Sequence, residues 1–167
     1  MVAVPCGAAA ARLAALGLSL PAPMQAVASY VPFTIAAHGA SHLIHIAGQG
    51  PFADGQLRHL GRLGASLSLA QGQDCARLVA LNVLAQAGDA VRSLTGRIDL
   101  DRLRCLRLGC FVQCVAGFAD IDLVVDPASL LMHDCLGENG RHARCAAGKP
   151  SLPMGTSVEI DAIFAVM

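Results

Sequence analysis

The architecture can be inferred outward from one C-terminal segment, GRHARCAAGKPSLPMGTSVEIDAIFAVM, residues 140–167. Two strand-like stretches in it are separated by Pro and Gly residues, so we expect them to form adjacent strands of a hairpin. The first stretch carries Arg144 among mostly small residues, and the second carries Glu159 among mostly apolar ones. Burying an unpaired charge is costly, so these two side chains need either a partner or a function.

Upstream of this segment, the pattern of apolar residues predicts a hairpin, a long helix, a strand and a second helix. The expected ranges are 31–37 and 41–48 for the hairpin, 69–95 for the long helix, 103–115 for the strand and 127–136 for the second helix. The long helix has the clearest limits, because Ser68 and Gln71 match a capping box and Gly96 follows the last turn. Asp126 and Pro127 are typical of the N-cap and first position of the second helix.

This order of elements predicts an α+β sandwich, in which two helices pack on one face of a mixed sheet. The last strand is nevertheless apolar on both sides, because Ile160 and Phe164 alternate with Ile163 and Ala165. No predicted helix remains to cover the second face. We therefore expect other copies of the chain to cover it.

The composition restricts the classes of function. The chain has 167 residues, 54% of them hydrophobic, and a formal net charge of zero. Its single Lys, Lys149, and scattered Arg residues do not suit nucleic-acid binding, which requires clustered positive charge. Such a neutral, apolar chain favours self-association. Seven irregularly spaced Cys indicate reduced thiols and a cytoplasmic location, and no stretch is apolar for long enough to span a bilayer.

The first 29 residues are expected to form a short helix over 8–16 and an extended, Pro-containing lead-in. Gly17 follows the helix in the position of a C-terminal cap. The Ala-rich start could instead be a targeting segment, but it has no basic region before the apolar part, and Arg12 interrupts that part. A single domain is predicted from residue 30 to residue 167.

Arg144 is the first candidate for a functional residue. On a strand it would share a face with His142 and Ala146, and small neighbours would leave space above its guanidinium group. Such a pocket suits a small carboxylate held by two parallel N–H···O bonds. A structural ion pair with Glu159 or Asp161 is the alternative.

Glu159 is the second candidate. A partly buried carboxylate can have a raised pKa and can act as a general acid or base on water or an amine. The alternative is a charge at the strand edge that faces solvent. No metal site is expected, because His42 and His45 are three residues apart on a strand and point to opposite faces.

Three motifs together resemble those of one known family. The stretch IAGQGP, residues 46–51, is similar to an S-G-Q-x-P strand end, and ARCAAG at 143–148 with VEIDAIFAV at 158–166 is similar to an A-R-S … I-E-I-E-A-I-A ending. These motifs resemble the YjgF/Rid family of reactive intermediate deaminases, once also described as endoribonucleases or translation inhibitors. The resemblance begins near Tyr30, and LGLSLP at 16–21 resembles a divergent branch with an N-terminal extension.

The resemblance implies a chorismate-mutase-like fold assembled as a homotrimer, with a barrel-like core and clefts between subunits. It implies that Arg144 binds a substrate carboxylate and that Glu159 positions a water molecule. It also implies that Tyr30 and Gly48 border the cleft. The implied reaction is hydrolysis of a 2-imino acid, or its enamine tautomer, to a 2-keto acid and ammonia. No cofactor is implied, because an iminium carbon is already electrophilic.

This chain departs from the family pattern at the cleft. Asp126 stands where Asn is frequent, and a carboxylate there would repel a carboxylate substrate if it points inward. Ala146 stands where Cys is usual, and His142 would add a polar group. Two other functions remain open: a non-catalytic trimer that binds a small metabolite, and a ribonuclease or translation inhibitor, which the neutral charge disfavours.

Overall fold

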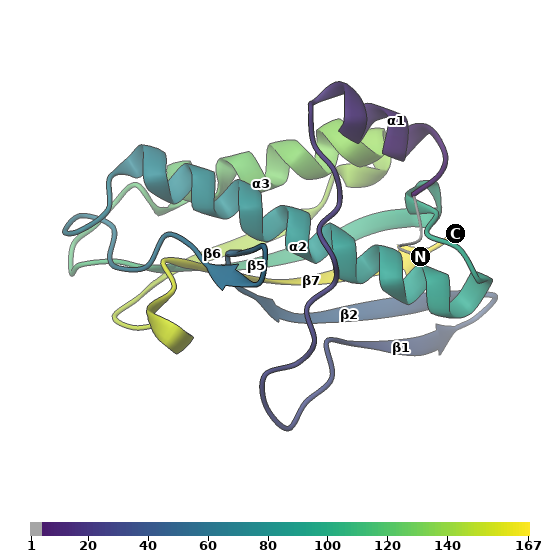
Figure 1. Cartoon of the computed structure of the whole chain (residues 1–167), viewed down its shortest axis with the longest axis horizontal. Helices are drawn as coiled ribbons and strands as arrows, with labels where there is room; N and C mark the ends of the chain where they lie inside the picture. Colours follow the sequence, from purple (N-terminus) through teal and green to yellow (C-terminus); the bar gives the residue numbers. More distant parts are fainter. Residues whose placement is uncertain (1–4) are drawn as a thin grey trace.

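The computed structural model describes residues 5–167, which form a five-stranded mixed sheet with three helices on one face (Figure 1). The first four residues of the possible targeting segment lie outside this range. The sheet order is β1-β2-β7-β5-β6, and only β5 and β6 are parallel. The sheet strands are β1 (Phe33–His38), β2 (Ser41–Gln49), β5 (Leu103–Gln113), β6 (Ala143–Lys149) and β7 (Val158–Val166). The predicted α+β class with a mixed sheet is confirmed.

The helices are α1 (Ala8–Ala15), α2 (Leu69–Thr95) and α3 (Ile121–Leu136), and a small hairpin pairs β3 (Phe52–Ala53) with β4 (Gln56–Leu57). The limits predicted for α2 are confirmed. The hydroxyl group of Ser68 accepts a hydrogen bond from the Gln71 backbone, and the Gln71 side chain accepts one from the Ser68 backbone. Gly96 ends α2 in the left-handed conformation, with φ of 82°.

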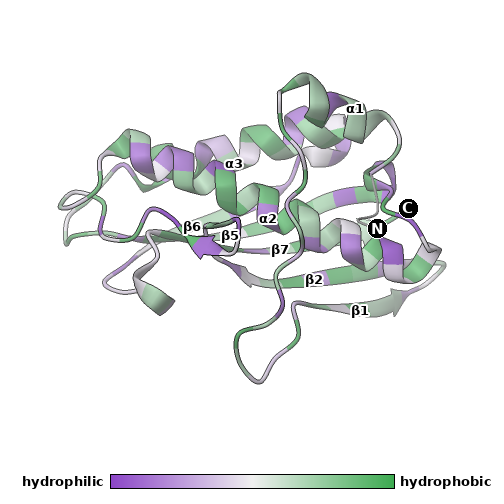
Figure 2. Cartoon of the chain, viewed as in Figure 1, coloured by the Kyte–Doolittle hydropathy of each residue, from purple (hydrophilic) through white to green (hydrophobic). Residues whose placement is uncertain are grey.

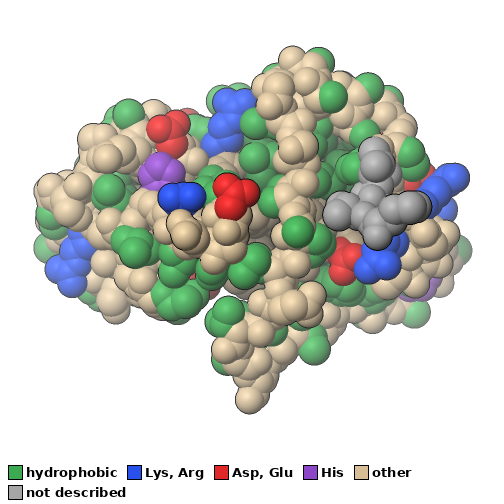
Figure 3. Space-filling view, in the orientation of Figure 1, with side chains coloured by type: hydrophobic (Ala, Val, Ile, Leu, Met, Phe, Trp, Pro, Cys, Tyr) green, Lys and Arg blue, Asp and Glu red, His purple; other side chains and the backbone are tan. Residues whose placement is uncertain are grey.

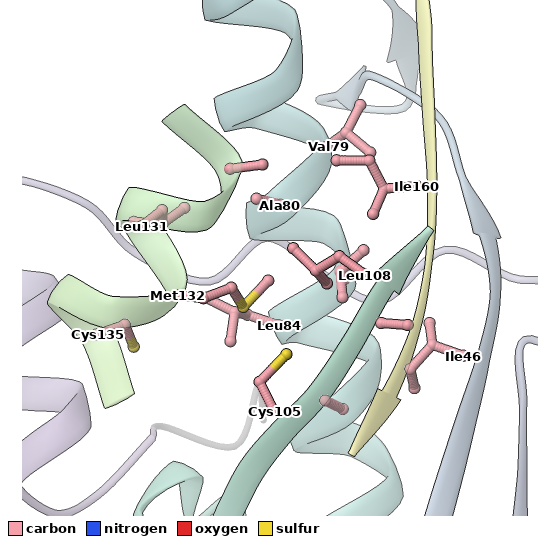
Figure 4. Close-up of a cluster of buried hydrophobic side chains, with 14 of the residues drawn as sticks. Ile46, Val79, Ala80, Leu84, Cys105, Leu108, Leu131, Met132, Cys135 and Ile160 are labelled. Carbon is pink, nitrogen blue, oxygen red and sulfur yellow. The ribbon is translucent and has the colours of Figure 1, made fainter. Parts of the chain in front are cut away.

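The core lies between the sheet and the helices (Figure 4). Leu84 of α2 and Met132 of α3 are fully buried near Leu108 of β5. Burial of side chains of this size stabilises the fold by about 1.5–3 kcal/mol each. Hydrophobic residues also predominate along β1 and β2, while hydrophilic ones are interspersed on α2 and α3 (Figure 2).

One face of the sheet carries no helix within residues 5–167, as predicted. Along β7 the residues alternate between fully buried and partly exposed. Val158, Ile160 and Phe164 point toward the helices, whereas Glu159 and Ile163 point to the helix-free face. Figure 1 shows the helices on the same side of the sheet.

The predicted C-terminal hairpin is wrong. Strands β6 and β7 are not neighbours, because β5 lies between them and pairs with both. Strand β6 runs parallel to β5, so the chain needs a crossover between them, and α3 provides it. Residues 150–157 then connect β6 to β7, which is antiparallel to β5 on its other side. Turn residues mark the end of a strand, but they do not determine the strand with which it pairs.

The predicted start of α3 is also wrong. The helix begins at Ile121, so Asp126 and Pro127 are interior residues and Asp126 is not a cap. A proline inside a helix leaves the carbonyl four residues earlier without its usual donor. Here that carbonyl, of Leu123, accepts a hydrogen bond of 3.0 Å from the Gln73 side chain of α2. A neighbouring helix thus compensates for the missing N–H group.

The N-terminal segment follows the prediction closely. Helix α1 spans Ala8–Ala15, and Gly17 after it has φ of 71°. The α1 residue Arg12 donates a 2.7 Å hydrogen bond to the Cys135 carbonyl at the end of α3. The lead-in then crosses over α2 before it enters β1 (Figure 1). No helix within residues 5–167 has the length and apolar character needed to cross a membrane.

Candidate functional site

The structure separates the candidate residues into two groups on opposite faces of the sheet. The first group lines a cavity beside β7, and the second lies where α3 packs over β6. The cavity group comprises Tyr30, Gly48 and Glu159, and the second group comprises Asp126, His142, Arg144 and Ala146.

Glu159 lies directly over the backbone of Gly48 on the neighbouring strand β2. Pairing between β2 and β7 is irregular between Ile46 and Gln49, and Gly48 occupies this irregularity. A Cβ atom at position 48 would collide with the Glu159 carboxylate, so only glycine leaves room for it. A close approach of this kind is one of the positions where glycine is required.

The Glu159 carboxylate has no hydrogen-bond donor among residues 5–167. Its partial burial raises its pKa, and the nearby charge of Asp161 on the same strand face raises it further. Asp161 differs, because it accepts a 2.7 Å hydrogen bond from Arg107 in an ion pair. Glu159 is therefore a partly buried, unpaired carboxylate that holds its proton more tightly than an ordinary glutamate.

The cavity beside Glu159 has a volume of about 420 Å³. Its walls come from the lead-in, from the segment after β2 and from the segment before β7. Large side chains in these walls are Met24, Val27, Tyr30, Phe52 and Met154. Among the lining residues within 5–167, Glu159 is the single charged side chain, and the neutral polar side chains are those of Gln25, Tyr30, Gln49 and Thr156. The cavity is therefore mostly apolar, with one carboxylate.

Two buried amides of α2 hold the walls in place. The Asn82 side chain donates 3.0 Å hydrogen bonds to the carbonyl groups of Gly50 and Phe52, and the Gln86 side chain donates one of 2.6 Å to Met24. Both side-chain amides are nearly inaccessible to solvent, so losing these bonds would leave a buried amide group without a partner. Asn82 and Gln86 were not predicted as site residues, although two amides one turn apart on an apolar helix face are a recognisable signal.

Arg144 is held by a polar face of α3. Its Nη1 atom lies 2.8 Å from Oδ1 of Asp126 and 3.1 Å from the Ser129 hydroxyl, and its Nη2 atom lies 3.4 Å from Oδ1 of Asp122. The three α3 residues are spaced by four and three positions, so they share one helix face. Neither Asp122 nor Ser129 was predicted as a site residue: Asp122 lies before the expected helix, and Ser129 carries no charge that marks it in the sequence.

His142 is connected to this cluster by a hydrogen bond with Ser129. Its Nδ1 atom lies 2.6 Å from the Gly140 carbonyl, which can only accept, so Nδ1 carries a proton. Its Nε2 atom lies 3.1 Å from the Ser129 hydroxyl, which already accepts from Arg144. In the neutral ring with its proton on Nδ1, Nε2 is an acceptor to which the Ser129 hydroxyl can donate. The series of hydrogen bonds from Arg144 through Ser129 to His142 can therefore form with a neutral imidazole ring.

Arg144 and Glu159 do not meet within one chain. Their strands, β6 and β7, are separated by β5, which places them about 10 Å apart across the sheet. They also point to opposite faces, because Arg144 contacts α3 whereas Glu159 lies on the helix-free side. The predicted alternative, an ion pair with Glu159 or Asp161, is wrong, since Asp126 and Asp122 fill that role.

The remaining candidates have simpler surroundings. Ala146 lies on the same face of β6 as Arg144 and packs against the core. No group of three or more His, Cys, Asp or Glu residues within 5–167 is arranged to hold a metal ion. The single Lys, Lys149, lies 5.5 Å from the centre of the Phe111 ring. Lys and Arg side chains are dispersed over the face shown in Figure 3 rather than gathered into a stripe.

A mixed sheet with helices on one face and a bare opposite face is the architecture of the YjgF-like, or chorismate-mutase-like, class of α+β proteins. The chain belongs to the family described as "YjgF/chorismate mutase-like, putative endoribonuclease", whose model matches residues 10–167. The resemblance inferred from the motifs is thereby confirmed.

Individual relatives support this membership over nearly the whole chain. Protein TCP17 of Trypanosoma cruzi is 38% identical over 165 residues, which cover 98% of this chain and 97% of that protein. Atu1372 of Agrobacterium tumefaciens, a crystal structure of a protein "with unknown function", is 40% identical with a TM-score of 0.83, covering 94% of this chain and 91% of its own. A Shewanella oneidensis MR-1 structure, described as an endoribonuclease in the same words as the family, is 28% identical with a TM-score of 0.83, covering 96% of this chain and 100% of its own.

Proposed function

We propose that this protein hydrolyses reactive imines, or their enamine tautomers, to carbonyl compounds and ammonia. The 2-imino acids, which give 2-keto acids, are the members of this substrate class to which the motif resemblance points. One observation carries the proposal: Glu159 is a partly buried carboxylate with a raised pKa, and it faces an apolar cavity without a hydrogen-bond donor of its own. A carboxylate that holds its proton more tightly than usual suits proton transfer to and from water or an amine.

In the proposed reaction, Glu159 accepts a hydrogen bond from a water molecule in the cavity. The water oxygen adds to the electrophilic C=N carbon while Glu159 takes a water proton, which gives a carbinolamine. Protonated Glu159 then returns the proton to the leaving nitrogen, the C–N bond breaks, and the departing ammonia takes the proton of the carbinolamine hydroxyl group. Water and imine are consumed, and a carbonyl compound and ammonia are released. The apolar walls limit competing water and strengthen these electrostatic interactions.

We also propose that the working unit is a homotrimer in which the helix-free sheet faces meet. Arg144 and Glu159 face opposite sides of one sheet, so a small ligand could contact both only if two copies contribute one each. The apolar residues Ile163 and Ala165 on the helix-free face support this assembly. Light scattering should give a particle mass of about three times the 17.1 kDa chain mass. A monomer at micromolar concentration would contradict it.

The function is tested with imines that a flavin-dependent oxidase generates in situ from an amine or an amino acid. Release of ammonia and carbonyl product should exceed the rate in buffer, and Glu159→Gln should lower this enzymatic rate by about 10²–10⁴-fold. Glu138→Gln, which changes an exposed glutamate, is the matched control and should retain the rate. A wild-type rate equal to buffer, or an undiminished rate in Glu159→Gln, would contradict the proposal. Ligand-dependent stabilisation without turnover would instead indicate a metabolite-binding protein.

A further inference from the structure

The positive charge of Arg144 is already offset inside the chain. Asp126 lies 2.8 Å from Nη1 and Asp122 lies 3.4 Å from Nη2, so one cation faces two carboxylates. The Arg144 side chain is only 21% exposed, whereas that of Asp126 is 49% exposed and that of Asp122 is 80% exposed. Solvent therefore screens Asp122 strongly, and Asp126 is the principal partner. An incoming anion would meet a neutralised guanidinium group.

The hydrogen-bond geometry restricts one edge of the guanidinium group. Nη1 carries two N–H groups, and the contacts with Asp126 and Ser129 account for both. A ligand carboxylate that uses both Nη atoms would have to displace Asp126. The displaced carboxylate would then lie beside the ligand carboxylate without a counter-charge. Two carboxylates in one site disfavour each other's ionised form, so this exchange is unfavourable.

The cavity on the other face also disfavours anions. Its single charged side chain among the described lining residues is Glu159, and no Lys, Arg or His lines it. A carboxylate entering this cavity would be desolvated beside a negative charge. A protonated imine would instead meet a negative charge and apolar walls formed by residues such as Val27 and Phe52. The cavity beside Glu159 thus favours neutral or positively charged ligands.

We infer that the site selects apolar imines without a carboxylate, such as those formed by oxidation of amines, and that Asp126 is the residue that determines this specificity. This inference rests on the proposed imine hydrolysis. The balanced reaction adds water to R–CH=NH₂⁺, breaks the C–N bond and releases R–CHO and NH₄⁺. Asp126 acts by occupying Arg144, which would otherwise attract the carboxylate of a 2-imino acid.

A matched pair of substrates tests the inference. Leucine with an amino-acid oxidase and 3-methylbutylamine with a flavin-dependent amine oxidase give imines that differ only by the carboxylate. The wild-type protein should accelerate hydrolysis of the amine-derived imine at least tenfold more than that of the imino acid. Asp126→Asn should shift this ratio at least tenfold toward the imino acid. Asp134→Asn removes the same charge from an exposed position of α3 and should leave the ratio unchanged.

A binding measurement separates this inference from the proposed function. Calorimetry compares 3-methylbutylammonium with 3-methylbutanoate, and wild type should prefer the cation whereas Asp126→Asn should reverse or abolish the preference. The ratio of the two affinities tests the inference even if neither imine is hydrolysed faster than in buffer. That lack of hydrolysis would contradict the proposed function but not the inference. Tighter binding of the carboxylate by wild type, equal affinities, binding of neither probe, or a ratio unchanged in Asp126→Asn overturns the inference.

Discussion

Asp126 and Glu159 are both partly buried carboxylates beside the same sheet, yet their surroundings differ completely. Asp126 accepts a 2.8 Å hydrogen bond from Arg144, which is itself connected through Ser129 to His142. Glu159 has no donor among residues 5–167, and its burial raises its pKa. One carboxylate belongs to a satisfied polar network, and the other is left free to interact with something that enters the cavity.

Under the proposed function, this difference divides stability and reactivity between two regions of the chain. Satisfied polar groups stabilise a fold and fix its geometry, so the Arg144 cluster suits a role in selecting ligands. An unpaired buried charge costs stability, but it retains the capacity to bind water or a cation. Residues that break local rules for stability are often those that carry function. Substitutions in the two regions should therefore have distinct consequences.

Among substitutions that keep both carboxylates, the largest expected effect follows from Gly48→Ala. The new Cβ atom would occupy the position of the Glu159 carboxylate and force that side chain into another rotamer. Displacement of a catalytic group by about 1 Å can lower a rate by about 10²-fold, so we expect a loss of this size in imine hydrolysis. The free energy of unfolding should change by less than about 1 kcal/mol, because a flexible side-chain end can move aside. Steady-state kinetics and urea unfolding measure the two quantities.

Gly109→Ala is the control for this substitution. Gly109 lies under Asp161 as Gly48 lies under Glu159, and an added Cβ atom would collide with that carboxylate. Asp161 pairs with Arg107, so the expected consequence is a loss of stability with the rate largely retained. If both glycine substitutions lowered the rate equally, position 48 would have no special relation to the chemistry.

A smaller effect is expected from Arg144→Ala, which removes the centre of the satisfied network. Asp126, Ser129 and Asp122 would lose their common donor, and the cluster is partly exposed, so we expect a loss of about 1 kcal/mol in the free energy of unfolding. Glu159→Gln should not lower the free energy of unfolding by a comparable amount, because it removes an unpaired charge. Urea unfolding at equal protein concentration compares the two variants. Equal losses in both would contradict the distinction between the regions.

The sequence was sufficient to predict those parts of the fold that depend on local signals. The capping box at Ser68 fixed the start of α2, and alternation along β7 identified a sheet face without helices. The prediction of a C-terminal hairpin was wrong, because strand pairing across a crossover depends on the whole topology. The predicted start of α3 was wrong, because Gln73, on another helix, donates the hydrogen bond that Pro127 cannot provide. No pattern around Pro127 itself contains that information.

The candidate site shows the same limit. Arg144 and Glu159 could be identified because each is a charge in a strand of small or apolar residues. Their surroundings could not, because the partner of Arg144 depends on where α3 begins. Gln86 was overlooked for a related reason, since its role depends on the path of the lead-in over α2. Chemically unusual residues are visible in sequence, whereas their partners require the tertiary structure.

The smallest effect concerns the pH dependence of stability, which should have opposite signs for two glutamates. Folding raises the pKa of Glu159 above its ordinary value of 4.5, chiefly by burial and then by the charge of Asp161. The folded state therefore binds this proton more tightly than the unfolded state. The resulting stabilisation is complete below the unfolded pKa and is lost as pH rises through the folded pKa. Wild type should thus lose stability relative to Glu159→Gln as pH rises above about 4.5.

Glu138 provides the opposite case, because its hydrogen bond and ion pair with Arg141 lower its pKa below 4.5. Its contribution is present above the unfolded pKa and is lost as pH falls through the folded pKa. Wild type should therefore gain stability relative to Glu138→Gln as pH rises, the reverse of the trend for Glu159→Gln. Urea unfolding of the three proteins across pH 3–7 measures both trends. A Glu159→Gln trend that matches that of Glu138→Gln would mean that Glu159 has a stabilising partner in solution, and the contrast with Asp126 would disappear.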